Sequence, residues 1–415
     1  MSALANSLSP TPTFEPSRAA GLERLNAFAP RMGGHYKSKR NYDMGPEDRA
    51  GVSLLSPYIR HRLVTEQEAL STALAHHSLS SADKFIQEVF WRTYWKGWLE
   101  MRPSVWQRYR TTVAAQNRDL ETNRALRKAV EKAEAGTTGI DCFDSWAREL
   151  VETGYLHNHT RMWFASIWIF TLRLPWERGA DFFLRYLLDA DAASNTLSWR
   201  WVAGLQTRGK NYAAQAWNIK KFTGGRFDPG NTLADNPPPL TEAADLPKPL
   251  PPRSIREPSR NARSLLLLTA EDCTVESIPH LDRLEIAEIL LVPTAPERSC
   301  GQTSAMAIDF EAAALRDAAT RAEAALQSGT PPRAVSNATE IVARARAQGA
   351  SQLVTAGLPV GWTKEWFDRA QPEFHEAGLS LTEIHRRWDT LCWPAATAGF
   401  FKFKERIPKF VPQLI

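Results

Sequence analysis

The proline-rich stretch from Phe227 to Arg263, FDPGNTLADNPPPLTEAADLPKPLPPRSIREPSRNAR, is the feature that most constrains the fold. Proline fixes φ and lacks a backbone N–H, so a stretch this rich in proline sustains neither helix nor sheet. It predicts an extended linker or a strap on the surface. A chain of 415 residues commonly forms more than one domain. We therefore expect a domain over 1–228, a linker over 229–261, a second domain over 262–394 and a C-terminal extension over 395–415.

Helical periodicity runs through almost all of the first part. The segment TEQEALSTALAHH opens with Thr65 and Glu68 at the spacing of a capping box, and LETNRALRKAVEKAEAG ends at Gly136, a typical helix cap. The segments SADKFIQEVFWRTYWKGWLEM, FDSWARELVETG and HNHTRMWFASIWIFTLRL carry apolar residues at helical spacing. The pattern predicts a mostly α-helical domain.

In the second part of the sequence, the spacing of apolar residues is different. The short apolar runs RSLLLLTAED, LEIAEILLVP and ASQLVTAGLP alternate with amphipathic segments such as DFEAAALRDAATRAEAALQSG. Strands that alternate with helices predict an α/β domain with a parallel sheet, of Rossmann-like type. It has neither a G-x-G-x-x-G nor a Walker motif, so no phosphate site is marked. The last segment, WDTLCWPAATAGFFKFKERIPKFV, is aromatic and basic, and we expect it to fold back on the first domain.

Charge, cysteine content and hydropathy bound the setting of the protein. The formal net charge of +5 permits a nucleic-acid partner without requiring one. Four widely spaced cysteines (Cys142, Cys273, Cys300 and Cys392) match neither a zinc motif nor a disulfide framework. The N-terminal residues lack the apolar core of a signal peptide, and no apolar run reaches the roughly 20 residues of a membrane helix. These features predict a cytoplasmic protein without a membrane partner.

The stretch LLDADAASNTLSWRW gathers acids, an amide and indoles between Leu187 and Trp201. Asp189 and Asp191 near Asn195 could bind a divalent cation, but Ca²⁺ and Mg²⁺ sites usually collect more oxygen ligands. We therefore predict no metal. Another interpretation is that Asp191 or Ser194 caps the helix that follows.

Two other segments place polar side chains among aromatic ones. In TGYLHNHTRMW, His157 and Arg161 would share one helix face, as would Asn158 and Met162. In EVFWRTYWKGW the neighbours at i, i+3, i+4 and i+7 are an acid, two indoles and a cation, namely Glu88, Trp91, Arg92 and Trp95.

A plain helical core is the alternative interpretation of these segments. Of the 15 tryptophans, 11 lie between Trp91 and Trp217, and buried indoles chiefly supply apolar area. Buried charges in such surroundings require partners, however, so the acids and arginines point to a binding site.

Several motifs in the same order resemble the FAD-binding helical domain of the photolyase/cryptochrome superfamily over residues 1–229. They are RLNAFAPRMGGHYKSKRNYD, GVSLLSPYIRHRLVT, EVFWRTYW, TGYLHNHTRMWFAS and LLDADAASNTLSWRW. The resemblance implies a domain that binds FAD, whose flavin ring carries the chemistry.

The resemblance also assigns cofactor contacts. Ser53 and Ser56 would bind the FAD pyrophosphate, although Leu54 stands where the family often has arginine. Arg161 and Asp189 would pair beside the isoalloxazine. The full set of expected cofactor-binding residues is Tyr42, Ser53, Ser56, Arg92, Asn158, Arg161, Asp189, Asp191 and Asn195, with Asp191 at the ring edge and Asn195 at flavin N5.

On the substrate side, the resemblance is to photolyases for cyclobutane pyrimidine dimers. It implies that the flipped-out dimer contacts Glu88, Trp91, Asn158, Met162 and Trp201. Reduced FAD would donate an electron under light, and the residues implied in catalysis are Glu88, Asn195, Trp199 and Trp176, the last two in a photoreduction chain. The expected activity is that of a deoxyribodipyrimidine photolyase. The alternatives are a cryptochrome-like blue-light receptor, which binds FAD without repair, and a non-catalytic FAD-containing structural protein.

The chain also departs from the family pattern. Photolyases carry an α/β antenna domain before the helical domain, whereas the α/β part follows it in this sequence. Of a permuted order and an unrelated appended domain, we favour the permuted order. The sequence leaves open whether a second, antenna chromophore binds. The expected partner is damaged DNA, the expected state is a monomer, and four cations would either meet phosphate or face solvent: Lys210, Lys220, Lys221 and Arg226.

Overall fold

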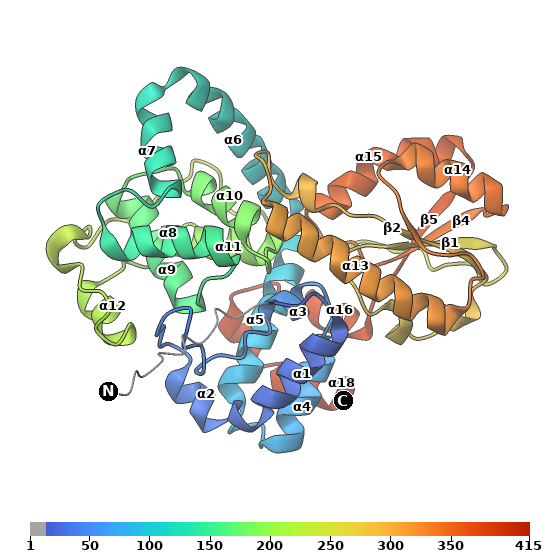
Figure 1. Ribbon diagram of the computed structural model, residues 1–415, viewed down its shortest axis with the longest axis horizontal. Coiled ribbons are helices and arrows are strands. Elements are labelled where there is room, and N and C mark those ends of the chain that lie inside the picture. Colours follow the sequence, from blue (N-terminus) through green and yellow to red (C-terminus); the bar gives the residue numbers. More distant parts are fainter. Residues whose placement is uncertain (1–13) are drawn as a thin grey trace, which may run out of the picture.

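A computed structural model describes residues 14–415, and Figure 1 shows a helical part beside an α/β part. The α/β part and the mostly helical first part agree with the fold class expected from the sequence. The first 13 residues, and with them the start of the expected first domain, lie outside the described chain. Among the described residues, no helix is both long and apolar enough to cross a membrane.

Twelve α-helices build the first part of the described chain. They are α1 (Arg18–Phe28), α2 (Gly34–Lys39), α3 (Ser56–Arg60), α4 (Glu66–His76), α5 (Asp83–Glu100), α6 (Pro103–Thr122), α7 (Arg124–Glu134), α8 (Asp141–Thr153), α9 (Asn158–Ser166), α10 (Trp176–Tyr186), α11 (Ala192–Ala203) and α12 (Ala216–Phe222).

Local sequence signals fix several helix ends. The capping box forms as predicted: the Thr65 hydroxyl accepts a hydrogen bond from the Glu68 backbone N–H, and the Glu68 carboxylate accepts one from the Thr65 N–H. Gly204, in the left-handed conformation at φ 82°, ends α11, because glycine adopts this conformation without a Cβ clash. The expectation that His157 shares a helix face with Arg161 is wrong. His157 precedes α9 as its N-cap and accepts a hydrogen bond from the His159 N–H.

Five parallel strands form the sheet, in the spatial order β3-β2-β1-β4-β5. The elements of this part are β1 (Ser264–Leu268), β2 (Ile286–Leu291), α13 (Ala305–Leu326), β3 (Arg333–Ala334), α14 (Ala338–Gln348), β4 (Gln352–Ala356), α15 (Trp362–Glu376) and β5 (Ser380–Ile384). The three apolar runs singled out in the sequence contain β1, β2 and β4. Two strands were not predicted from the sequence: β3, which has only two residues, and β5, which is half-exposed.

Both faces of the sheet are covered. Along β1, Leu266 and Leu268 join the large core shared with α13 and the helical part, while Leu265 and Leu267 join a second core with α14 and α15. Successive strand residues point to opposite faces, so a run of leucines can serve two cores. Figure 1 shows α13 on the side of the helical part, and α14 and α15 on the other side.

The proline-rich segment lies along the helical part as a strap, in agreement with the sequence. Between residues 229 and 261 the only helical turn is a 3₁₀ turn, Gly230–Thr232. The Leu250 N–H donates to the Met101 carbonyl at 2.8 Å. Arg253 pairs with Glu100 of α5 and with Glu383 of β5, so the strap ties the two parts together.

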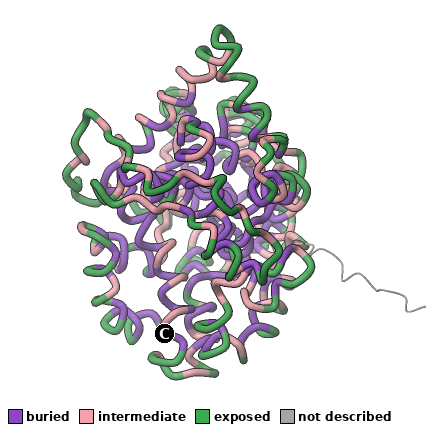
Figure 2. Tube along the Cα trace, turned by 90° about the vertical axis from the view of Figure 1, so that its left-hand side faces the viewer, coloured by how far each residue is buried: buried purple, intermediate pink, exposed green. Residues whose placement is uncertain are grey.

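The C-terminal segment folds back on the helical part, as expected. It comprises α16 (Arg387–Cys392), α17 (Phe400–Lys404) and α18 (Ile407–Leu414). The Trp388 Nε1 donates to the Thr93 hydroxyl at 2.9 Å, and the Trp388 ring stacks on Phe90 of α5. Figure 2 shows the continuous buried interior that results, with exposed residues gathered on the outside.

Candidate functional site

A cavity of about 470 Å³ opens in the helical part. Its wall is built by α3, α5, α9 and α11 and by the loop before α11. Thirteen residues that the sequence proposed for the site line it together: Ser53, Ser56, Glu88, Trp91, Arg92, Asn158, Arg161, Met162, Asp189, Asp191, Asn195, Trp199 and Trp201. Segments more than a hundred residues apart in the sequence thus converge on one site.

Two residues proposed from the sequence lie outside the cavity wall. The Tyr42 ring packs edge-on against Phe222 at 5.0 Å between ring centroids. The Trp176 ring lies 5.8 Å from Tyr109. Trp199 does line the cavity, and the indole in contact with it is Trp168, at 6.3 Å. The cofactor role of Tyr42 and the electron-transfer role of Trp176 stay predictions.

Asp191 forms the buried floor of the cavity. Its carboxylate accepts a hydrogen bond from the Ser194 N–H at 2.8 Å and so caps α11, as one interpretation of the sequence held. The same carboxylate lies 3.3 Å from the Lys96 ammonium and 3.5 Å from the Arg92 guanidinium. Burial opposes its ionisation, but Lys96, Arg92 and Arg60 together hold its pKa far below the usual range. Asp191 is therefore a fixed negative charge.

Asp189 and Arg161 form a second pair in the wall. An Arg161 nitrogen lies 2.8 Å from the Asp189 carboxylate, and Arg161 also donates to the Leu156 carbonyl. The second oxygen of Asp189 is buried and has no hydrogen-bond partner among residues 14–415. A buried acceptor without a partner costs free energy unless a ligand satisfies it.

Aromatic rings and one ion pair surround the mouth of the cavity. Glu88 forms an ion pair with Arg40, and both side chains are half-buried. The surrounding protein raises the pKa of Glu88 by removing water, while Arg40 opposes the rise. The Trp91 ring stacks on Phe400 of α17 with 3.5 Å between centroids, and Trp201 stacks on Tyr212. The C-terminal segment thus supports one wall of the mouth.

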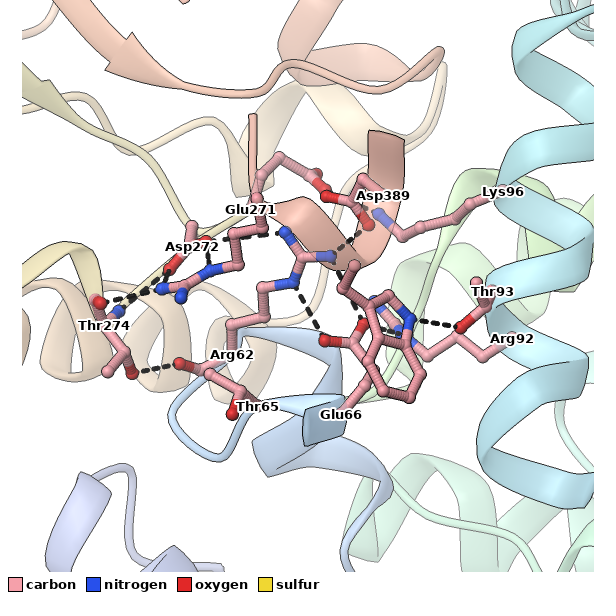
Figure 3. A network of polar contacts seen from close by, with 12 residues as sticks. Arg62, Thr65, Glu66, Arg92, Thr93, Lys96, Glu271, Asp272, Thr274 and Asp389 are labelled. Carbon is pink, nitrogen blue, oxygen red and sulfur yellow. Dashed lines mark hydrogen bonds and ion pairs between the residues drawn. The ribbon is translucent and has the colours of Figure 1, made fainter. Parts of the chain in front are cut away.

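Behind the floor, a network of buried charges joins the helical and α/β parts (Figure 3). Arg62 lies at its centre and pairs with Glu66, Asp272 and Asp389. Glu271 pairs with Lys96 at 3.0 Å and so extends the network to the floor.

Four charged residues around this site were not predicted from the sequence: Arg40, Arg60, Lys96 and Glu271. Lys96 follows Arg92 by four residues on α5, so helical spacing could have revealed it. Arg40 stands in one of the motifs quoted above. Glu271 carries no local signal, because only tertiary structure brings it to α5.

Within residues 14–415, no group of three or more His, Cys, Asp and Glu side chains is arranged to hold a metal ion.

Comparison with known proteins identifies the helical part. Residues 85–234 match the family model for the FAD-binding domain of DNA photolyase. This part of the chain is therefore similar to the FAD-binding domain of DNA photolyases. The assignment covers α5 to α12, and so most of the cavity wall.

Individual relatives share only part of their length with this chain. A deoxyribodipyrimidine photo-lyase from Synechococcus is 31% identical over 225 residues, which cover 50% of this chain and 43% of that protein. One from Streptomyces griseus is 33% identical over 170 residues, 40% of this chain and 36% of that protein. The match to a solved bacterial class III photolyase from Agrobacterium tumefaciens covers 50% of this chain and 43% of that protein. The identity is 25% and the TM-score is 0.42. The chain thus spans less than half the length of these relatives.

The matching family model describes an FAD-binding domain, and the polar groups of the cavity wall fit this cofactor. Four residues of the wall hold a buried polar atom without a hydrogen-bond partner among the described residues: Arg92 Nε, Asp189 Oδ1, Ser194 Oγ and Trp199 Nε1. A ligand with both donors and acceptors, such as the flavin ring, can satisfy them. Ser53 and Ser56 line the cavity beside the buried Leu54, which carries no charge. Their role in binding the pyrophosphate stays a prediction.

Proposed function

We propose that the protein repairs cyclobutane pyrimidine dimers in DNA, by light-driven electron transfer from reduced FAD. The observation that carries this proposal is the mouth of the cavity, where a desolvated carboxyl group, Glu88, lies among the indoles Trp91 and Trp201 beside the flavin-binding residues. Stacking surfaces and one hydrogen-bonding acid are what a flipped-out pyrimidine dimer requires of its pocket.

Different residues of the cavity have different roles in the proposed reaction. Reduced FAD, when bound, supplies the electron after it absorbs light. Arg161 and Asp189 orient the ring, and Asn195, whose amide donates to the Ala180 carbonyl at 2.8 Å, is held against rotation. In the proposed reaction Glu88 donates a hydrogen bond to the dimer and stabilises the charge that develops on it. Desolvation raises the pKa of the Glu88 carboxyl group, which is the direction that a hydrogen-bond donor needs, while Arg40 opposes the rise.

The C-terminal segment supports the proposed DNA partner. Phe401 is 78% exposed, next to the Phe400 ring that stacks on Trp91. The cations Lys402, Arg406 and Lys409 of the same segment are also exposed, and among the described residues none of them has an ion-pair partner. Exposed aromatic rings between cations suit a nucleic-acid strand, because bases stack and phosphates are neutralised.

The decisive experiment is repair itself. Photoreduced protein is mixed with an oligonucleotide that carries one cyclobutane dimer, and intact thymines are counted after exposure to blue light and after darkness. We expect restoration in the light only, and tighter binding of damaged than of undamaged DNA. Bound flavin with no repair and no preference for the lesion would reject this function and leave the receptor alternative.

We also propose the N5 position for Asn195. A change of Asn195 to Asp adds a negative charge beside the ring, which should disfavour the anionic reduced flavin. The absorption spectrum under light and air should then show a different persistent redox state. An unchanged spectrum would contradict the assignment.

For the α/β part, we propose an antenna-type, Rossmann-like domain in permuted order. The strand order β3-β2-β1-β4-β5 supports this, since the same order begins the doubly wound fold. An absorption band of the purified protein beyond those of FAD would indicate an antenna chromophore. Absence of such a band from protein reconstituted with candidate chromophores would count against an antenna role.

A further inference from the structure

The carboxyl end of the central strand of the sheet points at the flavin cavity. Strand β1 is bonded to both β2 and β4, and the residues after it contact the helical part. Arg60 donates to the Ala270 carbonyl at 3.2 Å, and the Cys273 N–H donates to the His61 carbonyl at 2.8 Å. Glu271, between these contacts, is therefore held by backbone on both sides.

The Glu271 carboxylate joins two cations that also serve the cavity. One oxygen lies 2.8 Å from the Arg60 guanidinium, and the other lies 3.0 Å from the Lys96 ammonium. Lys96 in turn lies 3.3 Å from Asp191 in the cavity floor. One ammonium thus sits between two carboxylates, one from each part of the molecule. Figure 3 shows Lys96 reaching from α5 toward Glu271.

Arg60 provides a second connection between Glu271 and the cavity wall. Its Nε donates to the Ala190 carbonyl at 2.5 Å, and Ala190 lines the cavity between Asp189 and Asp191. Arg60 is 1% exposed, so its position depends on its partners rather than on solvent. A change at Glu271 therefore reaches both carboxylates of the cavity wall.

The charges around Asp191 balance only when Glu271 is counted. Three cations approach Asp191: Arg60, Arg92 and Lys96. Arg92 is shared with Glu66 at 3.8 Å, while Arg60 and Lys96 are shared with Glu271. These groups are buried, and charges interact strongly where water is excluded. Removal of Glu271 would leave an excess positive charge behind the cavity floor.

We propose that Glu271 of the α/β part is a positioning residue of the flavin site, which holds Lys96 and Arg60 in place and lowers the reduction potential of the bound FAD. The proposal rests on FAD occupying the cavity and not on DNA repair. It gives the α/β part a function in the chemistry of the helical part, independent of any antenna chromophore. A negative charge nearby disfavours the anionic reduced flavin, which is the physical basis of the effect.

The test is the reduction potential of the FAD-loaded, full-length E271Q variant, measured by dye-coupled photoreduction. Without the charge of Glu271, we expect the reduced-to-oxidised ratio at a fixed potential to rise about tenfold, a shift of about 30 mV to more positive values for two electrons. The E271D variant, which keeps the charge, should return most of the way to the wild-type potential.

Glu288 offers a matched control. It is a buried carboxylate of the same sheet, paired with Arg333 and Arg344, and it does not line the cavity. The E288Q variant should lose stability without a shift in the flavin potential. An equal shift in E271Q and E288Q would overturn the proposal, because it would indicate general loosening of the α/β part.

A double variant tests the proposal even if E271Q alone does not fold. E271Q/K96M removes one charge of each sign, so its net charge equals that of the wild type, and its potential should lie nearer to the wild type than that of either single variant. An unchanged potential in every FAD-loaded variant would overturn the proposal while leaving DNA repair untouched. Loss of repair with the predicted shift intact would instead reject the proposed function alone.

Discussion

The floor and the mouth of the cavity hold their charges in opposite ways. At the floor, Asp191 is 3% exposed and is fixed by a backbone N–H and two cations. At the mouth, Glu88 has one ion pair, with Arg40, and about a third of its side chain remains exposed. A fully compensated site suits a cofactor that stays bound, whereas at a single half-buried ion pair an incoming ligand can replace Arg40. In the proposed function, this difference separates cofactor binding at the floor from substrate binding at the mouth.

The largest effect is expected at the floor. Asp191→Asn removes the buried charge that faces Lys96 and Arg92, and an uncompensated buried cation costs about 3–5 kcal/mol. We expect a clear drop in melting temperature and loss of bound flavin, measured by thermal unfolding and by the ratio of flavin to protein absorbance. Full flavin content in this variant would contradict the assignment of the floor to cofactor binding.

The buried charges behind the floor should also make the stability of the protein depend on pH. Burial opposes the ionisation of Glu271, but Arg60 and Lys96 lower its pKa to about 2. A lowered pKa contributes stability above the unfolded value near 4.5, which is lost as the pH falls toward the folded value. The stability advantage of the wild type over E271Q should therefore shrink by about 2 kcal/mol between about pH 6 and about pH 3. Urea unfolding at several pH values measures it, and an advantage that is constant with pH would contradict the assigned charge.

At the mouth, Glu88→Ala should slow repair about a hundredfold, the usual cost of one catalytic hydrogen-bond donor. Flavin content should not change, because Glu88 makes no contact with the charges of the floor. The measurement is the repair rate under saturating light, with the flavin-to-protein ratio as the control. Loss of flavin equal to the loss of rate would show that Glu88 belongs with the cofactor.

The smallest effect is expected at the rim. Phe401→Ala removes an exposed ring that can stack on a base, a contact worth about 1–3 kcal/mol in single-strand binding. The lysines beside Phe401 would also contribute to DNA binding, so the loss of this one ring should weaken the affinity for damaged DNA about tenfold. Fluorescence anisotropy measures this affinity. Melting temperature and flavin spectrum should match the wild type. Val151→Ala, at another exposed apolar residue, is a control that should leave DNA affinity unchanged.

Much of the helical part was predictable because its signals are local. Thr65 and Glu68 stand at capping distance, and Asp191 caps α11 from three residues away. The alternation of Leu265 to Leu268 between two cores could not be foreseen in detail, since a run of leucines is compatible with a strand or a buried helix. His157 was misassigned because the turn at Gly154 ends α8 and delays the start of α9.

By itself, the sequence determined which residue types meet at the cavity: the acids, arginines, asparagines and indoles of four motifs on four segments. Only the tertiary structure decided how their charges are balanced. Glu271 lies 80 residues beyond Asp191 and follows a strand in the other part of the molecule, yet it shares Lys96 with that carboxylate. The physical reason is that helix and strand signals act over a few residues, whereas a buried charge is compensated by whatever partner the fold brings within a few ångströms.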